Sequence, residues 1–205
     1  QRIEEQSKMM KSVWKVWDSY FDIGNGQTLD ECYEAYNNKE MGVVRESMGK
    51  LVENFVDDVC DMLNQKFDVD IECKFGESDR IPITNQSGRV LGFQVDKHIY
   101  INSELKAIVE CKSYLDRSML IRASDDIGRI KKGINHKIKG FVLSLENAVA
   151  KQAEDYLLDE GNVDKIFYLT EGKRNSYRQI WRPEFNKELD KNVMKEFIEN
   201  LIKLF

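Results

Sequence analysis

The sequence predicts an α/β fold in which helices flank a mixed central sheet. Three observations lead to this prediction. A long amphipathic helical pattern comes first, several short strand patterns then follow one another across turn residues, and the later strand patterns are separated by helical stretches. Strands joined by hairpins pair antiparallel, whereas strands joined by helices usually pair in parallel. This order therefore indicates one sheet with both kinds of pairing, covered by helices.

The composition is that of an ordinary globular domain. The chain has 205 residues, of which 41% are hydrophobic and 33% charged, and this length suits a single domain. No apolar run is long enough to cross a membrane and no signal peptide is visible, although the chain begins at Gln1 rather than Met. These features lead us to expect a cytoplasmic protein.

The charge balance restricts how this protein could bind nucleic acid. The formal net charge is -5 and the sequence pI is about 5.3. A protein that coats nucleic acid indiscriminately is usually basic. Binding to DNA would therefore need local basic clusters, or metal ions that offset acidic residues.

The cysteines do not form a metal-binding pattern. The four cysteines are scattered, none belongs to a Cys-x-x-Cys pair, and the chain has only 2 histidines. Structural zinc requires closely spaced Cys and His ligands, so a zinc site is not expected. We interpret the thiols as small, partly buried residues in a reducing compartment.

The first half of the chain is predicted to be mainly helical. Residues 1–40 are expected to form a helical N-terminal segment of the same domain, used for dimerisation or DNA contact. Apolar residues then recur every three or four positions over about 41–65, which predicts a long amphipathic helix. Residues 41–205 are expected to form the main domain, ending in a recognition loop and a last helix.

The remaining elements follow from alternating or helical patterns. Strand patterns cover, in order, Val69 to Cys73, Val90 to Val95, His98 to Ile101, Leu105 to Cys111, Phe141 to Leu143 and Ile166 to Leu169. Helical patterns cover 116–133, 148–159 and about 187–204. The stretch from Gly76 to Arg89 is polar and rich in turn residues, so a loop is expected there.

One predicted hairpin carries a set of charged residues. Asp96 follows an apolar run where one strand begins, and the next strand ends in Glu110-Cys111-Lys112. Side chains two apart on a strand point to the same face, so Glu110 and Lys112 project together and Cys111 points the other way. The spacing from Asp96 to Glu110 is that of one hairpin. Pairing of the two strands would bring two carboxylates and an ammonium into one small volume.

Hydrolysis of a phosphodiester needs this combination of groups. Carboxylates bind a hard cation such as Mg²⁺, which prefers oxygen ligands and keeps several waters. The cation offsets charge that develops on the phosphate and lowers the pKa of a bound water. A lysine beside the carboxylates can orient that water and offset the phosphate charge.

The hairpin resembles the PD-(D/E)xK nuclease superfamily, in particular type II restriction endonucleases. The resemblance rests on Val95-Asp96, the strand that follows, and Val109-Glu110-Cys111-Lys112. Val95 departs from the family pattern because it replaces the nominal proline. The family core has the order helix, three strands, helix, strand, and the same order is expected here over about 41–145. The resemblance implies a PD-(D/E)xK core, with Asp96, Glu110 and Lys112 as catalytic residues.

The resemblance also implies a metal site. Its expected cofactor is Mg²⁺, with Mn²⁺ as a substitute, and the expected ligands are Asp96, Glu110, Cys111 and Glu53. Glu53 is included as a catalytic residue because such families often supply a further glutamate from an upstream helix within a Gly-x-x-x-Glu pattern, which Gly49 to Glu53 matches. Glu46, one heptad earlier, is the second choice.

Several basic and amide residues are candidates for DNA contact. The segment from Thr170 to Arg182 combines cations, amides and aromatics, the side chains that bind phosphates and base edges. The candidates are Lys173, Arg174, Asn175, Arg178, Arg182, Arg80, Arg89, Arg117 and Arg122. The alternative for each is a solvated surface residue. His98 could contact a phosphate, but an ordinary strand histidine is the favoured interpretation.

The expected function is sequence-specific cleavage of double-stranded DNA by a type II restriction endonuclease. A symmetric duplex target would require two active sites, hence a homodimer, and a cognate DNA methyltransferase is expected in the same system. The alternatives are a repair, recombination or mobile-element nuclease with the same core, and a non-catalytic DNA-binding domain. The chain has no Gly-x-Ser-x-Gly and no Gly-rich phosphate loop, so a serine hydrolase and a nucleoside triphosphatase are not supported.

Overall fold

A computed structural model describes residues 41–85, 87–174 and 189–205 of the chain. The predicted N-terminal segment, residues 1–40, lies outside the described residues. Within the described part, no helix combines the length and the apolar character needed to cross a membrane.

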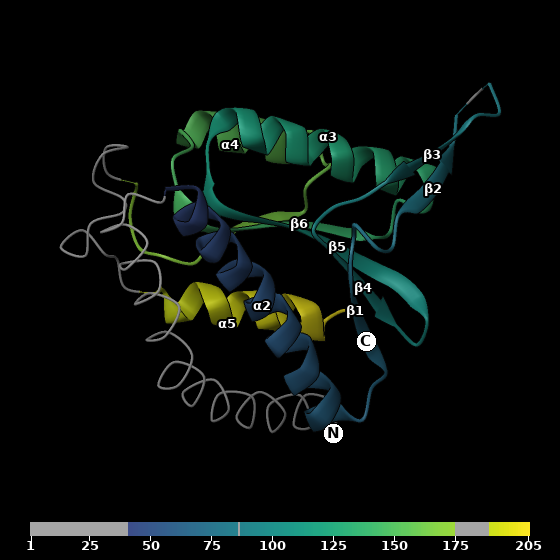
Figure 1. Ribbon diagram of the computed structural model, residues 1–205, viewed down its shortest axis with the longest axis horizontal. Coiled ribbons are helices and arrows are strands. Elements are labelled where there is room, and N and C mark those ends of the chain that lie inside the picture. Colours follow the sequence, from purple (N-terminus) through teal and green to yellow (C-terminus); the bar gives the residue numbers. More distant parts are fainter. Residues whose placement is uncertain (1–40, 86, 175–188) are drawn as a thin grey trace.

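The centre of the fold is a five-stranded mixed sheet with the order β1-β4-β5-β6-β7 (Figure 1). Its strands are β1 (Ile71–Phe75), β4 (Lys97–Ile101), β5 (Glu104–Leu115), β6 (Lys139–Asn147) and β7 (Lys165–Tyr168). The first three strands of this order pair antiparallel, and β5, β6 and β7 pair in parallel. The predicted mixed sheet with helices on its faces is therefore confirmed.

Two helices cover one face of the sheet. These are α2 (Met41–Phe67) and α5 (Lys191–Ile202), which lie together below the sheet in Figure 1. Helix α2 buries a stripe of residues at helical spacing, including Val52, Val56, Val59 and Leu63. They pack with α5 residues and with the β5 side chains on that face, so the core on this side fixes α2 against the strand that carries Glu110 and Lys112.

The other face is covered by α3 (Arg117–Gly133) and α4 (Lys151–Asp159), above the sheet in Figure 1. The Asp116 side chain caps α3 by accepting a hydrogen bond of 2.9 Å from the backbone nitrogen of Met119. Because Asp116 directly follows β5, this cap sets the sharp turn from the strand into the helix. A second apolar core lies between these helices and the sheet.

A separate two-stranded ribbon is the main departure from the predicted order. It consists of β2 (Ile81–Thr84) and β3 (Val90–Phe93), which pair antiparallel and have no third strand. The sequence predicts a loop over Gly76 to Arg89, but β2 lies inside this stretch. Strands β5 and β6 also extend beyond their apolar centres, because parallel pairing continues as far as Leu115 and Asn147. The predicted strand over Val90 to Val95 ends at Phe93.

Candidate active site

The hairpin of β4 and β5 places Asp96 beside the end of β5. Lys97 pairs with Val109, so Asp96, one residue earlier, lies beside Glu110 and Cys111. The Asp96 Oδ2 atom accepts a hydrogen bond of 2.7 Å from the backbone nitrogen of Cys111. This bond ties the aspartate directly to the strand that carries the other two candidate catalytic residues.

Lys112 joins the two carboxylates. Its Nζ atom lies 2.6 Å from Oε1 of Glu110 and 3.2 Å from Oδ2 of Asp96. It also donates a hydrogen bond of 3.1 Å to the carbonyl oxygen of Cys111. The three side chains predicted to meet across this hairpin therefore share one volume, and the ammonium sits between the carboxylates.

Burial and charge change how these groups bind protons. Burial raises the pKa of Glu110 above its ordinary value, and the Asp96 carboxylate raises it further, whereas Lys112 offsets part of this. Burial alone lowers the pKa of Lys112, but the Glu110 and Asp96 carboxylates together raise it above its ordinary value. Lys112 is therefore a firmly protonated ammonium in this arrangement.

Helix α2 brings a third carboxylate to the site. Burial raises the pKa of Glu53, and the repulsion of Asp96 raises it further, while Lys97 and Lys112 attract its charge. Glu53 therefore lies within electrostatic range of the β4–β5 hairpin. Glu46 lies on the same helix, but its side chain is outside the described part of the structure.

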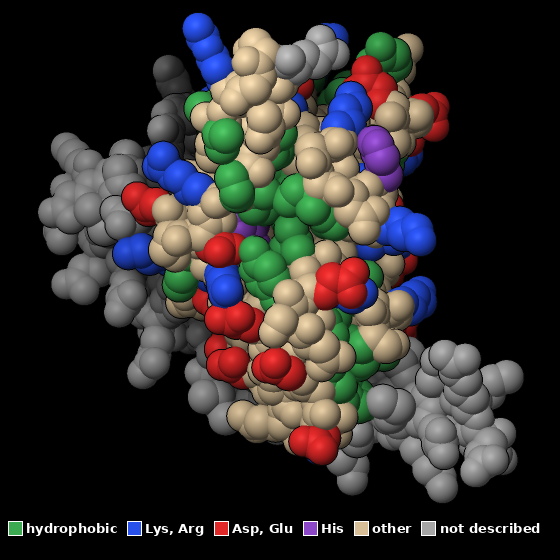
Figure 2. All heavy atoms as spheres, turned by 90° about the vertical axis from the view of Figure 1, so that its right-hand side faces the viewer, with side chains coloured by type: hydrophobic (Ala, Val, Ile, Leu, Met, Phe, Trp, Pro, Cys, Tyr) green, Lys and Arg blue, Asp and Glu red, His purple; other side chains and the backbone are tan. Residues whose placement is uncertain are grey.

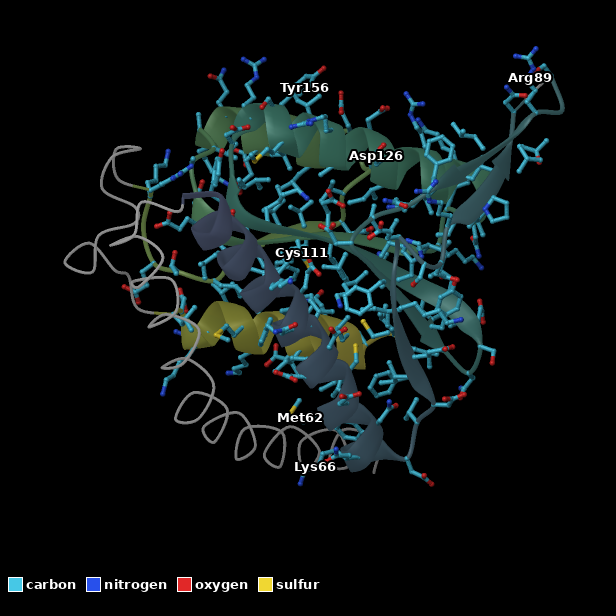
Figure 3. The ribbon with its side chains drawn as sticks, viewed as in Figure 1. Met62, Lys66, Arg89, Cys111, Asp126 and Tyr156 are labelled. Atoms are coloured by element: carbon cyan, nitrogen blue, oxygen red, sulfur yellow. The ribbon has the colours of Figure 1, made fainter. Side chains whose placement is uncertain are left out.

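The two atoms of Cys111 that could bind a metal lie in different environments. Its thiol is buried in the core shared with α2, near the centre of the molecule in Figure 3. Burial raises the pKa of this thiol well above its ordinary value, and the Asp96 carboxylate adds to the effect. The thiol is therefore a poor metal ligand, and the carbonyl oxygen is the atom of Cys111 that faces Lys112.

The described residues hold no group of three or more His, Cys, Asp or Glu side chains arranged to bind a metal ion. Asp96 and Glu110 instead share the ammonium of Lys112. Mg²⁺ is commonly held by one or two carboxylates, waters and substrate phosphate rather than by a complete protein cage. The donor set of Asp96 and Glu110 fits such a partial site, because the pKa of Glu110 is raised first by burial and then by the Asp96 carboxylate, and a cation would offset the second effect.

Lys97, directly after Asp96, was not singled out for the site by the sequence. Lys97 is fully buried and its Nζ lies 2.6 Å from Oδ2 of Asp57 on α2. Its ammonium also lies 3.5 Å from the centroid of the Phe75 ring. A charged first residue in an apolar strand was the available signal, but Asp57 is too distant in the sequence to be assigned as its partner.

His98 holds the turn before Asp96. Its Nδ1 lies 3.0 Å from Oδ2 of Asp79, and its Nε2 accepts a hydrogen bond of 3.3 Å from the backbone nitrogen of Val95. The Tyr100 hydroxyl donates to the same Asp79 oxygen at 2.6 Å. His98 is fully buried, so the favoured interpretation as a strand histidine describes its place, and its contacts fix the backbone that leads into Asp96.

Helix α3 contributes Asp126, which the sequence also left unassigned. Figure 3 shows this residue on the helix above the sheet. Burial raises the pKa of Asp126 and the neighbouring Asp125 raises it further, whereas Arg129 and Lys112 lower it. Asp126 therefore lies within the electrostatic range of Lys112, on the side of the sheet opposite to α2.

The candidates for DNA contact are spread over different surfaces. Arg117 and Arg122 are exposed on α3, and Lys173 is exposed after β7. The ribbon carries Arg89 near its tip, and Arg80 at its base donates from Nε to Oε1 of Gln94 at 2.9 Å. The remaining candidates, Asn175, Arg178 and Arg182, lie outside the described residues.

Arg174 lies in a different environment from the one expected for a surface contact. Only 8% of its side chain is exposed, and its guanidinium lies 3.6 Å from the centroid of the Tyr114 ring. Its Nε is 3.6 Å from Oε2 of Glu146. These contacts tie Arg174 to β5 and β6.

Comparison with protein-family models finds no match to this chain, and comparison with curated proteins finds none either. The functional argument therefore depends on the geometry and charge of the site.

Proposed function

We propose that this chain is a Mg²⁺-dependent DNA endonuclease with a PD-(D/E)xK core. The observation that carries the proposal is the Lys112 ammonium held between Asp96 and Glu110 on adjacent antiparallel strands. Glu53 adds a third carboxylate from a helix packed on the same hairpin. An acidic cluster with a single ammonium is a poor place for a phosphate unless a cation is also bound, and this favours metal-dependent phosphodiester chemistry.

Each residue has a role in the proposed reaction. Asp96 and Glu110 would hold the cation, with Glu53 as a supporting carboxylate. Bound Mg²⁺ offsets the charge of the phosphate and lowers the pKa of a coordinated water. Because Lys112 is protonated, it donates a hydrogen bond to the attacking water or to a phosphate oxygen rather than acting as a base. The attacking water would release a proton to solvent as its oxygen bonds to phosphorus, one P–O ester bond would break, and the departing oxygen would take up a proton from solvent.

Within this class, we favour a type II restriction endonuclease that acts as a homodimer on double-stranded DNA. Its restriction system would also include a cognate DNA methyltransferase. The support is the compact organisation of the described part around one catalytic hairpin. A repair, recombination or mobile-element nuclease would share the same site and differ in its substrate. Sequence-specific cleavage separates these functions.

The first test is cleavage of plasmid and phage DNA with Mg²⁺ or Mn²⁺ by the wild type and by Lys112→Ala. The matched control is Lys106→Ala, which removes a lysine from the same strand that pairs at 2.6 Å with Glu104, away from the site. We expect discrete fragments from the wild type and the control, and none from Lys112→Ala.

Other outcomes would change the proposal in defined ways. A smear that depends on Lys112 would retain the chemistry but indicate a non-specific or structure-specific nuclease. An absence of cleavage by wild type with either cation, together with DNA binding that is unaffected by Asp96→Ala, would contradict the proposal and indicate a non-catalytic DNA-binding domain.

A further inference from the structure

The β2–β3 ribbon projects from the body of the molecule beside the candidate site. Figure 1 shows it leaving the sheet near the end of α3, and Figure 3 shows Arg89 at its far end. Strand β3 ends at Phe93, three positions before Asp96. The base of the ribbon is therefore joined directly to the segment that carries Asp96, and a long molecule held along the ribbon would extend toward the candidate site.

The base of the ribbon is fixed to α3. Ile81 is buried, and a Cβ added at Gly133 would lie 2.6 Å from the Ile83 side chain, so this end of α3 and the ribbon are in tight contact. The Arg129 guanidinium also lies 5.8 Å from the centroid of the Phe93 ring. These contacts orient the ribbon on a rigid element.

The ribbon presents exposed apolar side chains on both of its faces, with Val90 beside the turn and Leu91 opposite Ile83 on the face that packs on α3. Val90 is 64% exposed and Leu91 is 62% exposed, although large aliphatic side chains are usually covered. Neighbouring residues on a strand point to opposite faces, so these two side chains are exposed on different sides. Figure 2 faces the side of the molecule from which the ribbon projects, and hydrophobic side chains run along the middle of this face. Docking on a flat partner would cover only one side of the ribbon, whereas entry into a groove would cover both.

The charge of the ribbon is opposite to that of the whole chain. From Arg80 to Gln94 the sequence contains Arg80 and Arg89 but no Asp or Glu, whereas the chain carries a net charge of -5. Arg80 is already held by Gln94. In the described part of the structure, Arg89 makes no side-chain hydrogen bond or ion pair, so its guanidinium is available at the tip.

The turn that carries Arg89 is held by its own hydrogen bonds. Oδ1 of Asn85 accepts from the backbone nitrogens of Ser87 and Arg89, each at 3.0 Å. Gly88 has φ +78, a backbone conformation that favours glycine. Asn85 therefore fixes the backbone of Ser87 and Arg89, which lowers the entropy lost when Arg89 binds a partner.

From these observations we infer that the β2–β3 ribbon enters the major groove of double-stranded DNA, with Arg89, Val90 and Leu91 as its contact residues. The major groove, about 12 Å wide and about 8.5 Å deep, admits a two-stranded ribbon. In it, Arg89 meets phosphate or a guanine edge, and the aliphatic side chains meet thymine methyl groups and sugars. This inference rests on the proposed function, because it identifies the element that holds the substrate of the same site.

The test measures binding of the full chain to a mixed-sequence DNA duplex. Lys112→Ala is used as the parent with Ca²⁺ present, so that binding is separated from cleavage. Arg89→Ala and Val90→Ser/Leu91→Ser are introduced into this parent, and Tyr156→Ser, which removes an exposed aromatic on α4, is the control. We expect Arg89→Ala to weaken binding by roughly tenfold, the double variant by roughly fivefold, and the control to leave it unchanged.

Two further measurements identify the groove and the kind of contact. A duplex whose cytosines carry glucosylated hydroxymethyl groups, which fill the major groove, should bind at least about tenfold more weakly, whereas netropsin in the minor groove should have little effect. Arg89→Lys should retain the salt dependence of binding, and Arg89→Ala should lower its slope by about one.

Failure of the inference is distinguishable from failure of the proposed function. If the parent binds DNA and all ribbon variants bind equally well, the ribbon inference is overturned while the nuclease proposal stands. Competition by netropsin alone would overturn the major-groove placement. If the ribbon variants change the oligomeric state in sedimentation but not DNA binding, the ribbon is an interface between copies of the chain. If the parent does not bind DNA and the wild type does not cleave it, both proposals are overturned.

Discussion

The buried ion pair next to the candidate site allows a quantitative test of what holds α2 in place. Lys97 is 0% exposed, and its ammonium lies 2.6 Å from Asp57, which is 30% exposed. Glu53 lies one turn before Asp57 on the same helix. The change Asp57→Asn retains the size of the side chain but removes the charge that compensates the buried ammonium.

The cost of this change follows from the burial of its two partners. Removing one partner of a fully buried pair costs about 3–5 kcal/mol, because a charge is left without compensation. Asp57 lies partly in water, which weakens the interaction, and the Phe75 ring retains about 1 kcal/mol of attraction for the ammonium. We therefore expect Asp57→Asn to lower the free energy of unfolding by about 2–3 kcal/mol, and the melting temperature by about 5–10 °C.

Urea unfolding followed by circular dichroism measures this effect, and a double-mutant cycle isolates the pair. The double variant Lys97→Met/Asp57→Leu replaces both charges by apolar groups, and its free energy of unfolding should be within about 1 kcal/mol of the wild-type value. The control is Asp155→Asn, which breaks an exposed pair with Lys151 at 2.8 Å and should cost less than about 0.5 kcal/mol. Equal costs for Asp57→Asn and the control, or strictly additive effects in the cycle, would refute the reasoning.

Other predictions concern the candidate site and its supporting turn. Burial and Asp96 raise the pKa of Glu110. Protonated Glu110 therefore stabilises the fold fully at pH values below the ordinary glutamate pKa, and this stabilisation is lost as pH rises through the raised pKa. Glu110→Gln should flatten this part of the stability-versus-pH curve without destabilising the fold at neutral pH, and an unchanged curve would contradict the assignment. If the proposed cation site exists, Mg²⁺ at about a hundred times its Kd should add about 2.7 kcal/mol to wild-type stability in a melting experiment, and much less to Glu110→Gln. Gly76→Ala should lower the free energy of unfolding by about 3 kcal/mol or more, because the new Cβ would lie 1.7 Å from the carbonyl oxygen of Val95. Gly49→Ala has nothing within 4 Å of its new Cβ and should raise the free energy of unfolding by about 0.5–1 kcal/mol. Equal effects of the two changes in chemical unfolding would refute the packing argument.

The hairpin that carries the candidate site could be predicted from the sequence because its geometry is local. Asp96, Glu110 and Lys112 belong to two consecutive strands, and the period-two rule with a hairpin connection is sufficient to bring them together. The long helix α2 was equally clear, since its apolar stripe repeats over many turns. The proximity of Glu53 was expected only through the family resemblance, because it depends on how α2 packs against the sheet.

The features that the sequence did not reveal depend on partners far apart in the chain. Charged residues usually lie at the surface, so the sequence did not indicate that Lys97 and His98 are buried. Their burial depends on the partners Asp57 and Asp79, which are distant in the sequence. Strand β2 was missed because Pro82 and the polar residues around it resemble a loop. Arg174 was expected at the surface, but stacking on an aromatic ring of β5 holds it inside.

The charge balance of the candidate site connects its stability to the proposed chemistry. On α2 and the β4–β5 hairpin, the side chains that interact electrostatically around the site are Glu53, Asp57, Asp96, Lys97, Glu110 and Lys112, and α3 adds Asp126 within range of Lys112. Carboxylates outnumber ammonium groups by two in the set on α2 and the hairpin, and this surplus adds to burial, the larger cause, in raising the pKa values of Glu53 and Glu110. These charges add little net stability, since buried charges lose hydration that their partners only partly replace. The surplus of negative charge at the site is what a bound divalent cation would offset, so the same carboxylates that repel one another in the metal-free fold are those that the proposed reaction requires.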